Sequence, residues 1–276
     1  MIDHVAVRML RTPEGAVGAL ALALAALFAL GAPLIAPGDP LAMAGRPLLA
    51  PFVDPGLPLG TDRLGRSVAA GVLHGARASL ATALSVAAVA LVLGAAVGTI
   101  AGYLGGLADE LLMRLADAVQ TVPSFLLALA LVSAVGPTPE GVIAALSASA
   151  WTAPARIVRA EVLSVRTRPF VEASRLFGRS RLAIAFTVVL PNAVAPVIAL
   201  AAVIVAAAIL SEAALAFLGL GDPNRASWGA MIAEGRAVLR TAPHVILAPG
   251  LALFATVLAV SLAGEGLSKA LAQRGA

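Results

Sequence analysis

Long, uninterrupted apolar segments constrain the fold of this chain more than any other feature. Alanine, leucine and valine run together repeatedly, hydrophobic residues make up 60% of the sequence, charged residues make up 12%, and the mean hydropathy is +0.97. A helix needs about 20 such residues to cross roughly 30 Å of hydrocarbon, where every backbone group must be satisfied inside helices or a closed barrel. The runs do not alternate with polar residues, which excludes a barrel. We therefore expect an all-α membrane protein.

Six spans can be assigned from the apolar segments. They are predicted at Val17–Ala36, Leu80–Tyr103, Leu111–Val135, Gly141–Val162, Leu182–Leu210 and Val245–Leu267. The first segment follows two arginines, as a signal peptide would, but its apolar stretch is longer than a signal-peptide core. We expect an uncleaved anchor.

The basic residues predict how the chain is oriented in the membrane. If the N-terminus is cytoplasmic, twelve of the nineteen basic residues lie on the cytoplasmic side, in accord with the positive-inside tendency. These are Arg8, Arg11, Arg114, Arg156, Arg159, Arg166, Arg168, Arg175, Arg179, Arg181, Lys269 and Arg274. Both termini are then cytoplasmic. Because the basic residues are scattered between spans, the net charge of +4 is not read as a nucleic-acid-binding face.

Several kinds of chemistry have no signature in the sequence. There is no cysteine, so disulfides and thiolate sites are excluded. A phosphate-binding loop needs Gly-Lys, but the only lysine, Lys269, follows Ser268. The three histidines are far apart, and neither a zinc-protease helix nor a hydrolase nucleophile elbow is present. We therefore expect no catalytic residue and no metal site in this chain.

A short helix is predicted in the basic loop before the fifth span. Pro169 suits a first helical turn, Glu172 falls where the helix dipole favours an anion, and Gly178 can end the helix in the left-handed conformation. The resulting helix of about nine residues is too short to span, and one face is apolar. That face carries Phe170, Ala173, Leu176 and Phe177. Beyond it, Pro191 is expected to interrupt the next span.

Three further features call for a structural interpretation. Thr61 or Asp62 is predicted to cap a helix that follows the turn Gly60–Arg66. Glycines recur every fourth residue at Gly94, Gly98 and Gly102, which predicts close approach of another helix. Glu212 lies near the outer end of the fifth span; an interfacial or intersubunit-paired carboxylate is weighed against a place in a transport path.

The loop residues resemble a known motif. Glu172-Ala173-Ser174, Gly178, Val188 and Leu190-Pro191 are similar to the EAA loop of ATP-binding-cassette importer permeases, with Ser174 in place of Ala and Val188 in place of Ile. An ordered set of further matches resembles the C-type subunit of the dipeptide, oligopeptide and nickel permeases. The set comprises Leu59–Arg66, Asp117–Pro123, Trp151 with Arg156 and Arg159, Pro191-Asn192, Glu212 with Phe217–Gly221, Trp228-Gly229 and Pro249-Gly250.

The resemblance implies a type I importer permease fold with about six transmembrane helices and a cytoplasmic coupling helix. It implies a cytoplasmic segment at 1–15, a first helix and extracytoplasmic connector at 16–79, a permease domain at 80–270 with the EAA loop at 168–191, and a cytoplasmic tail at 271–276. The implied ATPase-coupling residues are Glu172, Ala173, Ser174, Phe177, Gly178, Leu190 and Pro191. Glu212 and Asn192 are candidates for a translocation path or gate, and Arg63, Arg66 and Trp228 for docking of a binding protein.

The implied function is import of dipeptides or oligopeptides across a bacterial or archaeal inner membrane. The implied partners are a paralogous permease, two cytosolic subunits that bind ATP and Mg, and an extracytoplasmic solute-binding protein. Import of nickel or another small solute is an alternative. A secondary carrier or channel is another, but it would be expected to show inverted repeats and acidic residues at mid-depth. The sequence shows no such repeat and only Glu212 near the bilayer.

Overall fold

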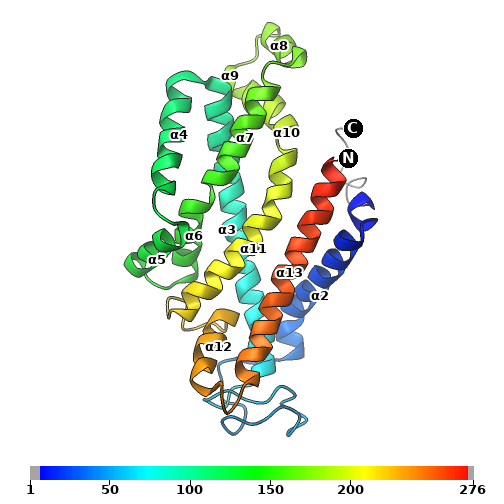
Figure 1. Ribbon diagram of the computed structural model, residues 1–276, viewed down its shortest axis with the longest axis vertical. Coiled ribbons are helices and arrows are strands. Elements are labelled where there is room, and N and C mark those ends of the chain that lie inside the picture. The colour runs from blue at the N-terminus through cyan, green and yellow to red at the C-terminus, as the bar shows by residue number, and fades with distance from the viewer. Residues whose placement is uncertain (1–6, 273–276) are drawn as a thin grey trace.

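The computed structural model describes residues 7–272 as a helical bundle, with no β-strand in that range. Four helices run along its long axis: α2 (Pro13–Ile35), α3 (Val68–Leu104), α11 (Ala195–Phe217) and α13 (His244–Ala272) (Figure 1). Each is long and apolar enough to cross a membrane, and the number of spans rises to as many as six if each of two bent helix pairs is counted as one span. The all-helical membrane fold is thus confirmed. The outermost parts of the expected cytoplasmic segments, 1–6 and 273–276, lie outside the described residues.

Two predicted spans are bent rather than straight. The segment predicted at Leu111–Val135 consists of α4 (Gly106–Gln120) and α5 (Ser124–Val135), which meet at 83°. Pro123 lies at the junction, where it supplies no N–H to continue a helix. The next predicted span consists of α6 (Pro139–Ala150) and α7 (Thr152–Val165), bent by 41°. Pro154 cannot donate to the carbonyl of residue 150, so the helical ladder is broken there.

The helix α3 begins twelve residues before the predicted start at Leu80. The prediction missed this start because an apolar window alone does not mark where a helix begins. Its cap is Ser67, whose hydroxyl accepts a hydrogen bond from the N–H of Ala70. The expected caps are wrong. Thr61 is buried and bonds Arg46 and Leu49 in the preceding connector, and the carboxylate of Asp62 closes a turn onto Leu64 and Arg66.

The glycine ridge on α3 permits close contact with α7, and the predicted packing role is confirmed. A Cβ atom at Gly98 would lie 2.3 Å from the carbonyl oxygen of Ala155 on α7. Added Cβ atoms at Gly94 and Gly102 would likewise meet α7 within 3 Å. Backbones can approach this closely only where no side chain intervenes.

The fifth predicted span is interrupted, as predicted from Pro191, but it is divided into several short segments before the long helix. It comprises α9 (Arg181–Ile184), a π-helical turn (Ala185–Val189), α10 (Leu190–Ala193) and then α11. The interruption lies at Val194, directly before Ala195-Pro196. A short helix, α12 (Trp228–Gly235), and a 3₁₀ turn (Arg236–Val238) fold between α11 and α13.

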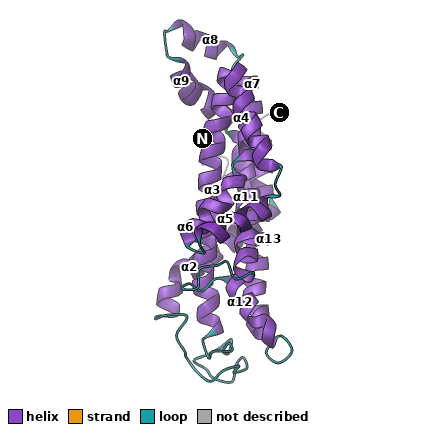
Figure 2. Cartoon of the chain, turned by 90° about the vertical axis from the view of Figure 1, so that its left-hand side faces the viewer, coloured by secondary structure: helices purple, strands orange, loops and turns teal. Residues whose placement is uncertain are grey.

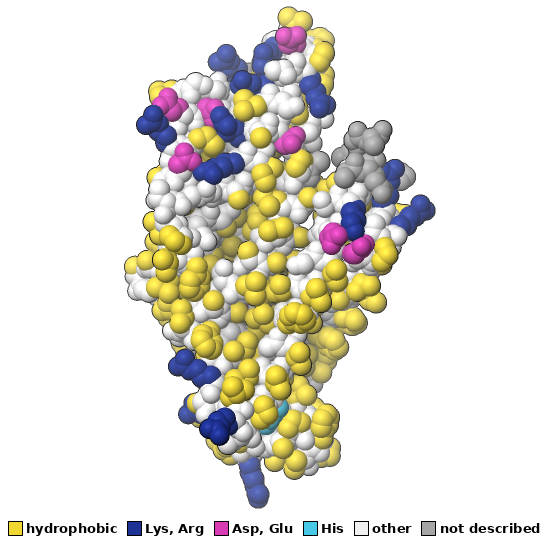
Figure 3. Space-filling model, in the orientation of Figure 1, with side chains coloured by type: hydrophobic (Ala, Val, Ile, Leu, Met, Phe, Trp, Pro, Cys, Tyr) yellow, Lys and Arg dark blue, Asp and Glu magenta, His cyan; other side chains and the backbone are white. Residues whose placement is uncertain are grey.

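The two ends of the bundle differ in structure and in charge. The first comprises α8 (Pro169–Leu176) and α9, with the start of α2 and the end of α13 on the same side; we call it the α8 end (Figures 1 and 2). The opposite, α12 end carries α12 and the connector 36–67. Charged side chains gather at the two ends, and an apolar belt lies between them (Figure 3). This distribution suits a bilayer, whose hydrocarbon excludes charge from the middle.

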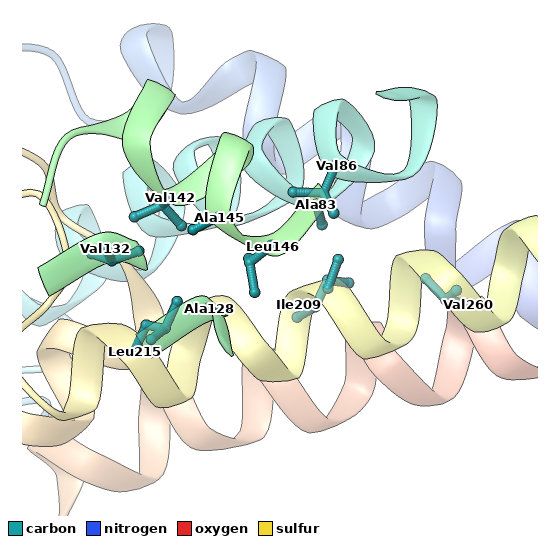
Figure 4. Close-up of a cluster of buried hydrophobic side chains, with 11 residues drawn as sticks. Ala83, Val86, Ala128, Val132, Val142, Ala145, Leu146, Ile209, Leu215 and Val260 are labelled. Atoms are coloured by element: carbon teal, nitrogen blue, oxygen red, sulfur yellow. The ribbon is translucent and has the colours of Figure 1, made fainter. Parts of the chain in front are cut away.

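The main core joins α3, α5, α6, α11 and α13. It contains Ala83, Val86, Ala128, Val132, Val142, Ala145, Leu146, Ala208, Ile209, Leu215 and Val260 (Figure 4). At the edge of the bundle, α2 packs on α13, and Lys269 at the end of α13 contacts Glu14 and Glu265, each at 2.9 Å. The first helix is therefore attached to the bundle mainly through the last.

Candidate functional site

The helix α8 has the boundaries that its sequence signals predict. Pro169 occupies the first helical position, Glu172 lies in the first turn, and the helix ends at Leu176, one residue shorter than expected. Gly178 follows with φ +74°, a left-handed conformation that a side chain would strain. Proline and glycine thus mark the two ends of this segment.

One face of α8 is apolar and uncovered. Leu176 is 89% exposed and Phe177 85% exposed, while Phe170 is 39% exposed. Glu172 and Ala173 are exposed beside them, and Ser174 donates to the carbonyl of Phe170 at 2.9 Å. Contiguous exposed apolar patches mark surfaces that bind another protein or the membrane. The surface of Phe170, Leu176 and Phe177 is called the α8 face.

The opposite side of α8 is anchored by a residue that the sequence analysis missed. Val171 is fully buried and belongs to a cluster with Val162 and Val165 of α7, Ile184 of α9 and Val189 of the π-helical turn. The sequence could have indicated this burial, because Val171 lies on the helical face opposite Ala173. The cluster joins α8 to the segments before and after it.

A second connection ties α8 and its preceding loop to the end of α3. The guanidinium of Arg175 lies over the ring of Tyr103, and its Nε is 3.4 Å from the phenol oxygen. Arg166 donates to the carbonyl of Gly102 at 2.8 Å. Both arginines were predicted only as orienting charges, yet each makes a specific contact with α3.

Two ion pairs brace α4 against α7. Arg159 binds both carboxylate oxygens of Asp109, at 2.5 and 2.6 Å, and Arg156 binds Asp117 at 2.5 Å. A guanidinium and a carboxylate match in this two-bond geometry, which fixes orientation as well as distance. The bent α4–α5 unit is therefore held at its α8 end by charge.

The loop residues beyond α8 lie in the interrupted span. Leu190 packs against the Val171 cluster, whereas Pro191 and Asn192 are exposed. The amide of Asn192 donates to the carbonyl of Val188 at 2.7 Å, a bond within its own segment. Asn192 does not line any of the cavities described below.

Glu212 is buried near the α12 end of α11. The hydroxyl of Ser79 on α3 donates to its carboxylate at 2.9 Å, and Glu212 is 8% exposed. Ser227, whose hydroxyl caps α12, lies next to the same carboxylate. Glu212 thus joins α3, α11 and the start of α12.

Three spaces follow one face of α3. The central cavity, of about 470 Å³, is lined by Val86 and by residues of the bent pairs and α11, Leu146, Ala208 and Ser211 among them. A small pocket of about 30 Å³, which we call the constriction, is lined by Thr82, Val142 and Glu212. The α12-end cavity, of about 440 Å³, shares Ala78 with the constriction. Residues 78, 82 and 86 are one helical turn apart, so they lie on the same face.

The expected docking residues do not form one surface. Trp228 is 2% exposed and donates to the carbonyl of Val72 at 3.0 Å, because α12 presses its ring against Gly75. A buried side chain cannot contact a docking partner, so the expectation for Trp228 is wrong. Arg63 is exposed, and Arg66 lies 3.6 Å from Glu234 of α12. Within residues 7–272, no group of three or more acidic or histidine side chains is placed to hold a metal ion.

Comparisons with known proteins agree with this architecture. Residues 94–275 match the family model described as "Binding-protein-dependent transport system inner membrane component". The chain is 40% identical over 265 residues to the di/tripeptide transport system permease protein DppC of Pseudomonas aeruginosa (strain UCBPP-PA14), covering 94% of this chain and 88% of the relative. It is 37% identical over 214 residues to the glutathione transport system permease protein GsiD of Pectobacterium atrosepticum, covering 77% and 71%.

The fold is also that of a solved transporter subunit. An inward-facing structure of the MetNI methionine ABC transporter matches with a TM-score of 0.57 and 19% identity. The match covers 73% of this chain and 96% of that one. At this identity the similarity concerns the fold.

Proposed function

Because this chain belongs to the family of binding-protein-dependent transport system inner membrane components, we propose that it is the permease subunit of an ATP-driven importer of dipeptides and oligopeptides. The relatives named for di/tripeptide and glutathione transport support a peptide substrate. A paralogous permease completes the translocation path, two cytosolic ATPases supply the work, and an extracytoplasmic solute-binding protein delivers the peptide. The ATPases bind ATP and Mg; this chain binds neither.

The uncovered α8 face is the observation that carries the proposal. Leu176 and Phe177 protrude from the α8 end, and Gly178 allows the chain to turn directly after them. Seated in a groove of the ATPase, this face would move with the ATPase as it closes on ATP. The contact is formed or flanked by the proposed coupling residues Glu172, Ala173, Ser174, Phe177 and Gly178. The other two coupling residues, Leu190 and Pro191, belong to the span that receives the motion.

Force applied to α8 has a route into the membrane domain. Val171 conveys it to α7, α9 and the π-helical turn, and Arg175 conveys it to Tyr103 at the end of α3. At its other end, α3 contacts Glu212 through Ser79. A partner can switch a protein between two states only if it binds one of them better, and the ATP-bound ATPase dimer fills that role.

We propose that Glu212 acts as a gate between the α12-end cavity and the central cavity. Its carboxylate lines the constriction, where too little space remains for a peptide. Alternation between outward and inward access would open this point and then close it. Asn192, which bonds within its own segment, is assigned to the interrupted span rather than to the gate.

The proposed orientation puts the α8 end and both termini in the cytoplasm. It rests on the excess of basic residues at that end and on the need for α8 to meet a cytosolic ATPase. The α12 end, with Arg63 and Arg66 exposed or partly exposed, then faces the binding protein.

Co-purification with the ATPase subunits tests the proposal. Glu172→Lys and Gly178→Pro are expected to abolish capture of the ATPases and peptide uptake, because they alter the charge and the turn that present the α8 face. Glu140→Lys is the matched control, since Glu140 is also an exposed acid in a first helical turn, but on α6, where the neighbouring Pro139 lines the constriction. Full peptide uptake without any ATPase would refute the proposed function.

A further inference from the structure

The α12-end cavity collects polar side chains from three separate parts of the chain. Asp39 comes from the connector after α2, His74 and Arg77 come from α3, and Asn224 and Arg225 come from the segment between α11 and α12. Its volume of about 440 Å³ lies within the range of roughly 300–1,000 Å³ that is usual for small-molecule sites. The cavity is therefore large enough for a small ligand.

Two of these side chains are arginines, and each keeps guanidinium donors free for a ligand. Arg77 is exposed and forms no ion pair with any residue in the range 7–272. Arg225 meets Asp222 through its Nε at 3.5 Å, and its side chain stays 58% exposed. An arginine has five N–H donors, so most donors of this guanidinium remain available.

Two other polar side chains of the cavity, Asp39 and His74, already make hydrogen bonds within the protein. The carboxylate of Asp39 accepts from the N–H of Leu41 at 2.9 Å and so closes its own turn. The Nε2 of His74 is 3.0 Å from the carbonyl of Ala36, a bond that ties the connector to α3. The side-chain amide of Asn224 carries no charge, so the charged donors free for a ligand are those of the two guanidinium groups, which favours an anion.

The position of the cavity suits a substrate that is entering the protein. Arg225 and Ala78 line both the α12-end cavity and the constriction that contains Glu212. From Ala78 to Val86 of the central cavity, α3 rises about 12 Å. A molecule bound at Arg77 and Arg225 is therefore next to the proposed gate.

We propose that Arg77 and Arg225 form a carboxylate-binding site that holds the C-terminal carboxylate of a peptide before it passes the constriction. Guanidinium groups bind carboxylates in a two-bond geometry, which gives orientation as well as affinity. The amino end of the peptide then points toward the carboxylate of Glu212. Each charged end of the zwitterionic peptide therefore faces a group of opposite charge. The identity of the ligand rests on the proposed function, whereas the preference for an anion rests on the cavity.

Transport by the complete complex in proteoliposomes tests this site. Dialanine and dialanine amide are each supplied at a concentration that saturates the binding protein. Differences in uptake then do not reflect selection by the binding protein. For Arg77→Gln/Arg225→Gln, uptake of dialanine is expected to fall about tenfold while uptake of the amide is unchanged. Arg240→Gln, which removes an exposed charge at the same end but outside the cavity, is expected to behave as the wild type.

A binding measurement separates this site from the transport function. In ligand-detected NMR titrations of the permease complex without binding protein, the wild type should bind dialanine more tightly than its amide, and the double variant should not distinguish them. Equal effects on both peptides in both assays would overturn the proposal. So would a transport defect seen only in vesicles containing phosphatidylglycerol, because the anion would then be a lipid phosphate. A wild-type complex that discriminates in binding but imports no peptide would instead refute the proposed function.

Discussion

Arg175 of α8 stacks on Tyr103 of α3, with its guanidinium carbon 5.6 Å from the centre of the ring. Tyr103 is the only tyrosine in the chain, and it lies one residue before the end of the longest helix. The pair therefore joins the exposed α8 to a helix that runs to the opposite end of the bundle.

Removal of this aromatic contact should weaken the coupling between ATP hydrolysis and transport. A cation over an aromatic ring contributes about 0.5–1 kcal/mol at exposed sites, so Tyr103→Ala should lower peptide transported per ATP about two- to fivefold. Tyr103→Phe keeps the ring and should retain most of the coupling, because only the 3.4 Å contact of the hydroxyl is lost. The measurement is the ratio of uptake to phosphate release in proteoliposomes. An unchanged ratio in Tyr103→Ala, with the ATPase still bound, would contradict the role.

The two sides of α8 should respond oppositely to truncation. Val171→Ala removes two buried methyl groups and should destabilise the permease by about 2 kcal/mol while the ATPases remain bound. Leu176→Ala, at an 89% exposed position, should leave stability unchanged and reduce ATPase capture. Thermal unfolding and co-purification are measured on the same preparations. If both variants lost ATPase and neither lost stability, the anchor assigned to Val171 would be wrong.

The ion pair of Arg159 and Asp109 should stabilise α4 against α7. Arg159→Gln leaves a partly buried carboxylate without its partner and should cost about 1–3 kcal/mol, between the values for exposed and buried pairs. Reversal of both charges, Asp109→Arg/Arg159→Asp, should recover part of the loss. Arg114→Gln is the control, because the pair of Arg114 and Glu110 is exposed and should matter little. Chemical denaturation of the four proteins gives the comparison, and a loss in Arg114→Gln equal to that in Arg159→Gln would argue against a special role.

Glu212 should control access to the central cavity from the α12 end. The chain contains no cysteine, so Ser211→Cys introduces a single label site that lines this cavity. Replacing the carboxylate in Glu212→Ala leaves Ser79 without its partner and widens the constriction. Labelling by a membrane-impermeant maleimide added at the α12 side should then be faster. Glu140→Ala should not change the rate, and an unchanged rate in Glu212→Ala would exclude Glu212 as the barrier.

Local signals predicted α8 well, because they depend on the chemistry of neighbouring residues. Pro169 suits a first turn and Gly178 accepts a positive φ wherever the segment lies in the protein. The same holds for the glycine ridge, which allows close packing whatever helix approaches it. The bend at Pro123 was missed because hydropathy measures the apolarity of a segment and is blind to its direction.

Apolar length, turn residues and charge distribution were enough to establish a membrane protein of about six spans with a short amphipathic helix at one end. Only the tertiary structure decided that Trp228 is buried and that Val171 is an anchor. It also decided that, among residues 7–272, Arg159 has an ion-pair partner whereas Arg77 has none. The physical reason is distance in the sequence. Burial and charge pairing depend on which remote segment comes within a few ångströms, as when Ser79 meets Glu212, and no local pattern contains that information.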